Sequence, residues 1–344
     1  MEKRVSNNFR IISSLSMIGI VFLHAKFIRS RWNETLIEND PISWTSNFFQ
    51  LLISEQITRL CVPLFFVTSG YFFFKNYDGS IQAYYIKLKS RYKTILIPYL
   101  FWCLFWFAIY NVFSRFQYLD SFPLALIDSL VNPIPFQLWF LKDLMALVFL
   151  SPLLYFLINK IKQRYLFTVL IMIYLLDFSI RSHIDSVVFF LLGASLFLSG
   201  NKWFLKQNFK INIYAYIILS LVFVFLNMYS LSVNHTFIVL IHKTSVIIGV
   251  WTILYFIFSL DMNHLSFKLL LNKLSAGYLF FLFASHEPLL SFLKSSFVMY
   301  FKSSFNLLGY FLLPLITIFI TYIIYFVLRK KLSCILFLVN GNRQ

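Results

Sequence analysis

Long apolar runs separated by short basic turns dominate the chain. With about 20 apolar residues taken as one membrane-crossing helix, the pattern predicts ten spans, at about residues 9–28, 55–74, 94–114, 136–158, 166–181, 187–200, 211–230, 236–258, 275–293 and 306–328. The fifth and sixth are short and separated only by RSHIDS, so a re-entrant pair is an alternative for them. The pattern therefore predicts an all-α, polytopic membrane protein. We predict that residues 1–344 form one membrane domain with a short tail over 329–344.

Composition and charge support the same class. Apolar residues make up 60% of the 344 positions and charged residues only 12%, and the mean hydropathy is +0.77, far outside the values of a soluble domain. Twenty of the 30 Lys and Arg residues fall in the N-terminal segment, the even-numbered turns and the tail, whereas seven fall on the opposite side and three within spans. Because Lys and Arg concentrate in cytoplasmic loops, both termini are predicted to be cytoplasmic.

The partners and compartment follow from the same residues. The net charge of +17 is mainly a topology signal, and nucleic-acid binding is disfavoured because no basic, aromatic-interleaved soluble module is present. The three cysteines are far apart and form no Cys-x-x-Cys motif, so neither a disulfide framework nor a metal site is predicted. We expect a multi-pass protein of a bacterial cytoplasmic membrane, in contact with the lipid bilayer.

Ionisable side chains inside the predicted spans are the candidate functional residues, because charge in the hydrocarbon is costly and is usually kept for function. At a rise of about 1.5 Å per residue, nearly all of them fall in the outer half of the bilayer: His24, Arg59, Lys142, Asp143, Asp177, His242, Lys243, His286 and Glu287. A common depth on six helices predicts a polar cavity that opens to the outer side.

Structural explanations compete with the functional one. A charge near a span end is equally well explained by snorkelling to the interface, which applies to Lys26, Asp177 and Lys243. Lys142 and Asp143 point about 100° apart on a helix, so pairing between helices explains them as well as catalysis does. His24 taken alone reads as a core histidine with satisfied hydrogen bonds. Its ionisable companions favour a functional role.

Four segments carry a family resemblance: FRIISSLSMIGIVFLHA (9–25), RLCVPLFFVTSGYFFF (59–74), FQLWFLKDLMALVFLSPLL (136–154) and KLSAGYLFFLFASHEPLL (273–290). Together they resemble the acyltransferase-3 family of ten-helix membrane acyltransferases, whose first helix carries an Arg followed by a His and whose second carries Val-Pro-x-Phe-Phe-x-x-Ser-Gly. Arg10 and His24 are separated by thirteen residues instead of the usual ten. This spacing keeps both on one helix face but adds roughly 4.5 Å along the axis.

The resemblance implies transfer of an acyl group, most commonly acetyl from acetyl-CoA, to a sugar hydroxyl of a cell-surface polysaccharide or its lipid-linked precursor. Acyl-CoA is then a co-substrate, and no permanently bound cofactor is implied. Such a transfer needs a base for the hydroxyl proton and positive charge for the oxyanion. We interpret His24 as the general base or transient acyl acceptor. Arg59, His286 and Glu287 complete the predicted catalytic set.

Further residues are assigned to the two substrates. The donor's phosphates are predicted to meet a cytoplasmic basic cluster formed by Arg10, Lys87, Lys89, Arg91 and Lys93, although ordinary positive-inside charge explains any one of these equally well. The substrate cavity is predicted to include Ser69, Trp139, Lys142 and Asp143. Ser69 and the following Gly70 also permit close approach of two helices.

Two alternatives from other classes remain open. A transporter or flippase for a lipid-linked saccharide would also use a polar cavity among many helices. Against it, the chain shows no clear internal repeat, and its polar groups cluster on one side of the membrane instead of around the midplane. A membrane scaffold or sensor would leave the Arg and His of the first span unexplained.

Overall fold

The computed structural model describes residues 2–27, 41–75, 77–112, 122–177, 183–198, 208–229, 234–259, 274–333, 335–341 and 343. Within these ranges the regular structure is helical, with no strand. Seven of the described helices are long and apolar enough to cross a membrane, or eight if one bent pair counts as a single span. The predicted all-α membrane class is therefore confirmed. The count of ten spans and the side of each terminus stay predictions.

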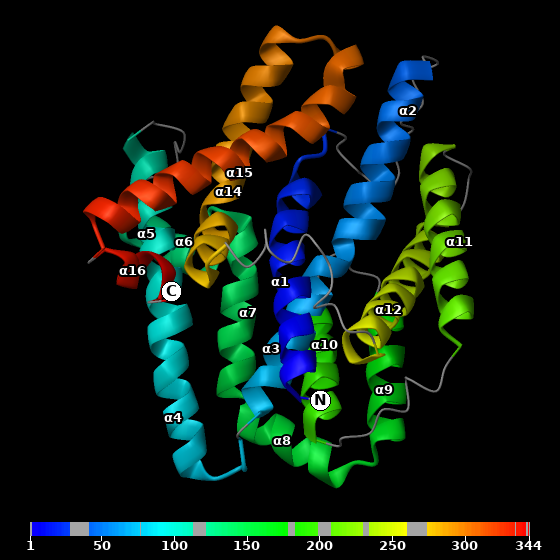
Figure 1. The fold of residues 1–344 in the computed structure, drawn as a ribbon, viewed down its shortest axis with the longest axis vertical. Helices are drawn as coiled ribbons and strands as arrows, with labels where there is room; N and C mark the ends of the chain where they lie inside the picture. The colour runs from blue at the N-terminus through cyan, green and yellow to red at the C-terminus, as the bar shows by residue number, and fades with distance from the viewer. Residues whose placement is uncertain are drawn as a thin grey trace.

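Residues 41–74 form one continuous helical segment whose central turns are not regular α-helix. It consists of α2 (Pro41–Gln50), the π-helical η1 (Leu51–Ile57), the 3-10 turn η2 (Thr58–Leu60) and α3 (Cys61–Phe74). Pro63 explains the irregularity, because its ring crowds the carbonyl of residue 59 and it has no N–H to give to it. α1 (Glu2–His24) packs against η2 and α3 (Figure 1) and ends four residues before the predicted limit.

The basic segment after α3 is helical, although the sequence pattern treats it as a turn. α4 (Ile81–Arg91), η3 (Tyr92–Leu96) and α5 (Ile97–Val112) follow one another without a break. Ser80 begins the helix, since its Oγ accepts a hydrogen bond from the backbone N–H of Ala83 at 3.1 Å. The third span therefore continues a basic helix that starts well before residue 94.

The next helices are shorter and more broken. They are α6 (Phe122–Val131), η4 (Phe136–Leu138), α7 (Trp139–Phe149), α8 (Ser151–Lys160), α9 (Gln163–Leu176) and α10 (His183–Leu198). α7 and α8 meet at 63°. Pro152 lies in the first turn of α8, where the missing N–H and the bulk of its ring prevent a straight continuation of α7. The predicted fourth span is thus two helices with a bend.

Glycines let α3 and α10 touch backbone to backbone. A Cβ on Gly70 would lie 2.0 Å from the carbonyl oxygen of Phe190, and a Cβ on Gly193 would lie 1.9 Å from that of Val67. Both distances are far shorter than any real carbon contact, so only glycine fits at either position. The predicted close approach at Gly70 is present, and it brings the beginning of α10 beside the Pro63 turn.

The last part of the chain contains α11 (Phe209–Met228), α12 (His235–Ser259), α14 (Ala276–Tyr300), η7 (Ser303–Phe305), α15 (Asn306–Lys331) and α16 (Leu336–Asn340). Pro288 lies inside α14 and leaves the carbonyl of Ala284 without its helical N–H donor. The Gln137 side chain donates to that oxygen at 3.3 Å and so ties η4 to α14. α16 packs on α5, where the indole of Trp102 donates to the Val339 carbonyl at 2.9 Å.

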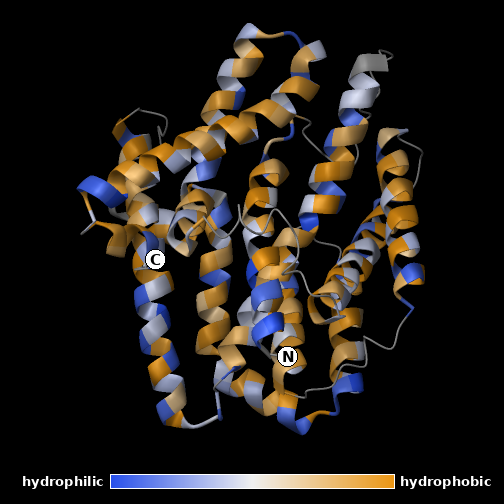
Figure 2. Cartoon of the chain, viewed as in Figure 1, coloured by the Kyte–Doolittle hydropathy of each residue, from blue (hydrophilic) through white to orange (hydrophobic). Residues whose placement is uncertain are grey.

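Apolar side chains cover the outside of the helices as well as the interior. Figure 2 shows apolar colouring along most of the helices, with the hydrophilic residues more frequent near helix ends and on α4. Ile218 on α11 and Phe319 on α15 keep 60% and 64% of their surface exposed. Exposed apolar rows on long helices are typical of contact with lipid.

Candidate active site

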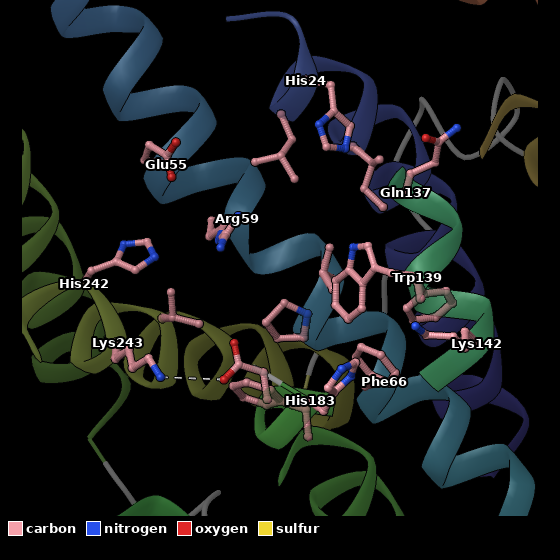
Figure 3. Close-up of a pocket in the computed structure, with 18 of the residues that line it drawn as sticks. His24, Glu55, Arg59, Phe66, Gln137, Trp139, Lys142, His183, His242 and Lys243 are labelled. Atoms are coloured by element: carbon pink, nitrogen blue, oxygen red, sulfur yellow. Dashed lines mark ion pairs between the residues drawn. The ribbon is translucent and has the colours of Figure 1, made fainter. Parts of the chain in front are cut away.

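Segments far apart in the sequence enclose a polar cavity of about 400 Å³. Its wall combines apolar side chains, such as Phe66 and Val246, with imidazole and charged groups: His24, Lys26, Glu55, Arg59, Lys142, His183, Asp185, His242 and Lys243. In Figure 3 the labelled side chains reach inward from α1, from the helical segment of η1 to α3, and from α7, α10 and α12. Four Lys or Arg side chains face two carboxylates, so the cavity carries an excess of positive charge when the imidazoles are neutral.

His24 is the last residue of α1 and lines the cavity. A helix end leaves carbonyls without helical partners, and here other segments supply them. Lys294 on α14 donates to the carbonyl of His24 at 3.2 Å and to that of Lys26 at 2.6 Å. Ser54 on η1 donates to the carbonyl of Phe22 at 3.0 Å. These bonds hold the end of α1, and with it the His24 imidazole, in a defined position.

His286 stacks on His24, with ring centroids 5.5 Å apart and ring planes 25° apart. It is fully buried, and its Nδ1 lies 3.0 Å from the Leu282 carbonyl oxygen and 2.8 Å from that of Phe283. A carbonyl only accepts, so Nδ1 carries a proton, and in the neutral ring Nε2 keeps a lone pair. That Nε2 is buried without a hydrogen-bond partner among the described residues.

Arg59 lies in the 3-10 turn before Pro63, and its side chain lines the cavity. One turn earlier, the buried Glu55 forms an ion pair with Lys26 from the segment after α1. This pair joins the end of α1 to η1. In Figure 3 Arg59 lies between Glu55 and the Trp139 side of the cavity, where its cationic side chain faces the interior.

Lys243 and His242 extend the polar wall along α12. The Lys243 ammonium donates to the Tyr174 carbonyl at 3.0 Å and lies 3.8 Å from Asp185 Oδ1 and 3.4 Å from Asp177 Oδ2. His242 Nδ1 lies 3.2 Å from Gln56 Nε2. Since the amide nitrogen is a donor, this assignment makes Nδ1 the acceptor. Lys243 is therefore engaged with α9 and α10 instead of snorkelling.

α7 contributes three of the residues predicted for the substrate cavity. Trp139 and Lys142 line it directly, and the Lys142 ammonium donates to the Val131 carbonyl at 2.9 Å. Asp143 is buried beside the cavity and binds two groups of α10: His183 Nδ1 at 2.7 Å and Ser186 Oγ at 2.9 Å. Lys142 and Asp143 thus have different partners, as their directions on the helix require.

Other predicted site residues lie elsewhere. Arg10 is exposed on α1 and Ser69 is half-buried on α3, and neither lines the cavity. Glu287 is bonded to Ser291, one turn further along α14. The residues of the basic cluster on α4 and η3 also lie outside the cavity lining: Lys87, Lys89, Arg91 and Lys93. Lys87 caps the C-terminal end of α3, because its ammonium donates to the carbonyls of Phe73 and Lys75 at 2.7 and 2.8 Å.

The sequence interpretation missed three of the imidazole and charged members of the lining: Glu55, His183 and Asp185. Glu55 stands four residues before Arg59, which puts both on one helix face, and this spacing was an available signal. His183 and Asp185 belong to RSHIDS, which reads as a connector because short polar stretches between apolar runs usually are. Only the packing of α10 against α3 and α7 brings them to the cavity.

Among the described residues, no group of three or more His, Cys, Asp or Glu side chains is arranged to hold a metal ion.

A family model described as "Acyltransferase domain" matches residues 10–327. The chain is also 27% identical over 172 residues to the succinoglycan biosynthesis protein ExoH of Rhizobium meliloti (strain 1021), a match that covers 46% of this chain and 45% of that protein. No solved structure matches the chain at a significant level.

Proposed function

Because the chain belongs to the acyltransferase-3 family, we propose that it transfers an acyl group, in the first instance acetyl, from acyl-CoA to a sugar hydroxyl of a surface polysaccharide or its lipid-linked precursor. The observation that carries the proposal is the imidazole of His24 at the wall of a polar, cationic cavity, with His286 stacked on it. The name of the relative, a succinoglycan biosynthesis protein, supports a polysaccharide acceptor.

The proposed chemistry assigns the proton to His24. The acceptor oxygen attacks the thioester carbonyl while a nitrogen of His24 takes the hydroxyl proton. The oxyanion of the tetrahedral intermediate is stabilised by the positive charge of Arg59. Collapse of the intermediate breaks the carbon–sulfur bond, and the CoA thiolate leaves and receives the proton from His24. The acyl group is then bonded to the sugar oxygen as the new ester.

A stepwise route uses the same residues. His24 first attacks the thioester and carries the acyl group, and the sugar hydroxyl then displaces the imidazole. Rapid quench with radiolabelled acetyl-CoA and no acceptor separates the routes. If wild type becomes labelled and His24→Ala does not, the stepwise route is supported. If wild type carries no label under conditions of full turnover, direct transfer is supported.

His286 is the positioning residue of this proposal. Its Nδ1 is fixed by two backbone carbonyls of α14, so its ring has one orientation and presents a constant face to His24. Glu287 is bonded to Ser291 and is not in the cavity lining. We therefore assign the catalytic work to His24 and Arg59, and the support of His24 to His286.

The proposal also includes an orientation of the protein in the membrane. It places the protein in a bacterial cytoplasmic membrane with the basic helix α4 and both termini on the cytoplasmic side, where acyl-CoA is available. The cavity then belongs to the opposite half of the bilayer. Many apolar helices long enough to span a membrane and the clustering of Lys and Arg support this arrangement.

Mass spectrometry of surface glycans tests the proposal. Cells that carry His24→Ala should lose one acyl mass per modified unit relative to wild type, because the proposed base for the hydroxyl proton is removed. His235→Ala is the control, since this histidine lies at the start of α12 and outside the cavity lining. Unchanged acylation with normal abundance of the His24 variant would contradict the proposal. Loss of glycan export with unchanged acylation would point to a transporter.

A further inference from the structure

Asp143 and His183 form a second polar feature of the cavity that the transfer chemistry does not use. Asp143 Oδ1 and His183 Nδ1 are 2.7 Å apart, across the packing of α7 against α10. The carboxylate side chain is 6% exposed, whereas the imidazole side chain is 76% exposed and lines the cavity. A buried acceptor thus holds an imidazole that is open to whatever enters the cavity.

The hydrogen bonds of Asp143 settle which nitrogen of His183 faces outward. An ionised carboxylate only accepts, so the neutral imidazole gives it the Nδ1 proton and keeps a lone pair on Nε2. Ser186 Oγ occupies the other carboxylate oxygen at 2.9 Å, and this serine also donates to the His183 carbonyl at 2.6 Å. Both the ring and the residue's backbone are therefore anchored, and Nε2 is a hydrogen-bond acceptor of defined orientation.

An aromatic face accompanies this acceptor. Trp139 stands one turn before Asp143 on α7, on the same side of the helix, and it lines the cavity with His183. In Figure 3 the Trp139 ring lies between His24 and His183, which are drawn at opposite ends of the cavity. A cavity of about 400 Å³ is within the usual size of a small-molecule site.

From this arrangement we propose that His183, oriented by Asp143, and Trp139 form the subsite that binds the acceptor saccharide away from its reacting hydroxyl. A sugar ring offers hydroxyl donors around its edge and a C–H face, which suit a fixed nitrogen acceptor and an aromatic surface respectively. This inference rests on the proposed function, and it assigns His183 to binding and specificity, with no part in the proton transfer at His24.

A purely structural lock between α7 and α10 is the competing explanation, and one substitution separates the two. His183→Asn keeps an N–H donor where Nδ1 stands, so the bond to Asp143 is retained while the Nε2 acceptor is lost. If the pair only holds α7 to α10, His183→Asn should behave as wild type in stability and in kinetics. A saccharide subsite would lose affinity for the acceptor only.

The test uses the full-length protein in lipid nanodiscs, with radiolabelled acetyl-CoA and base-deacylated surface polysaccharide fragments as probes. His183→Asn should raise the KM for the saccharide about tenfold, the loss of one hydrogen bond of about 1.4 kcal/mol. The kcat and the KM for acetyl-CoA should stay within twofold of wild type. Trp139→Phe should keep much of the saccharide affinity and Trp139→Ala should lose it. His235→Asn is the matched control.

A binding measurement without donor keeps the inference independent of turnover. Ligand-observed NMR of the same fragments should show weaker binding to His183→Asn than to wild type. An unchanged KM and unchanged binding in that variant overturn the subsite. If wild type transfers no acyl group and His183→Asn still binds the fragments more weakly than wild type, the subsite stands and the proposed transfer is refuted.

Discussion

At the scale of single residues, the histidines in and beside the cavity differ in what holds them. His286 is fixed by backbone carbonyls within its own helix, and His183 by a carboxylate from another helix. His242 lies against the Gln56 amide, whose oxygen accepts from Ser245 at 2.7 Å. Each arrangement selects a tautomer and a ring orientation. His183 and His242 therefore present imidazole rings of defined orientation to the cavity, and His286 presents a fixed ring to His24.

We expect His286→Asn to reduce transfer without removing it. Asparagine keeps an N–H donor for the carbonyls of Leu282 and Phe283 but has no ring to stack on His24. By analogy with groups that orient a ligating or catalytic histidine, kcat should fall about 10- to 100-fold. The KM for acetyl-CoA and the unfolding temperature should change little. Steady-state kinetics and thermal unfolding of the purified variant check this, and a kcat equal to wild type would contradict it.

At the scale of helices, the crossing of α3 and α10 decides where the cavity lies. Gly70 and Gly193 bring two backbones into contact, so the Pro63 turn with Arg59 and the beginning of α10 with His183 are held on one level. α14 is tied to the same region by the bond from Gln137 to the carbonyl that Pro288 leaves open. Helix contacts made by glycine and proline therefore assemble the wall of the cavity.

Gly193→Ala should destabilise the protein strongly. The new Cβ would lie 1.9 Å from the Val67 carbonyl oxygen, which belongs to a helix backbone and cannot rotate away. The cost should reach about 3 kcal/mol, the upper end of the range for overpacking. Gly19→Ala is the control, because its Cβ meets the Cys61 side chain at 2.7 Å and a side chain can shift. Thermal unfolding in detergent should show a clearly larger drop for Gly193→Ala than for Gly19→Ala.

The basic helix α4 gives a second expectation at this scale. If this basic segment binds the proposed donor, the paired change Lys89→Gln and Lys93→Gln should raise the KM for acyl-CoA severalfold, because both side chains are exposed and would attract its phosphates. Lys160→Gln with Lys162→Gln removes equal charge from the end of α8 and serves as the control. Equal effects of the two pairs would indicate a general surface potential. No effect of either would remove α4 from donor binding.

At the scale of the whole molecule, long apolar helices enclose a cavity with charged residues in its wall. Apolar residues predominate along most of the helices (Figure 2), as contact with lipid requires, and two ion pairs, Lys26–Glu55 and Lys243–Asp177, join separate segments of the interior. The last residues also belong to this body, since α16 packs on α5 and the Arg343 guanidinium lies 4.0 Å from the centre of the Phe280 ring. The predicted tail is thus packed against the helices over the residues that the structure describes.

The predicted orientation can be checked by cysteine labelling in intact cells. On a background with the native cysteines replaced by alanine, Lys302→Cys should react with a membrane-impermeant maleimide, because the turn before α15 is predicted to be outside. Ser90→Cys on α4 should react only after permeabilisation. Both positions are exposed. The opposite pattern would reverse the topology and place the basic helix outside.

The sequence by itself determined the class of the protein, the approximate position of its helices and the candidacy of His24, because hydropathy and charge act locally along the chain. Its family motifs also pointed to Arg59, Trp139 and His286. Only the tertiary structure decided which groups meet: His286 stacked on His24, Glu55 paired with Lys26, and Asp143 joined to His183. Such contacts depend on how each helix is rotated and where helices cross, and these are set by packing between segments far apart in the chain.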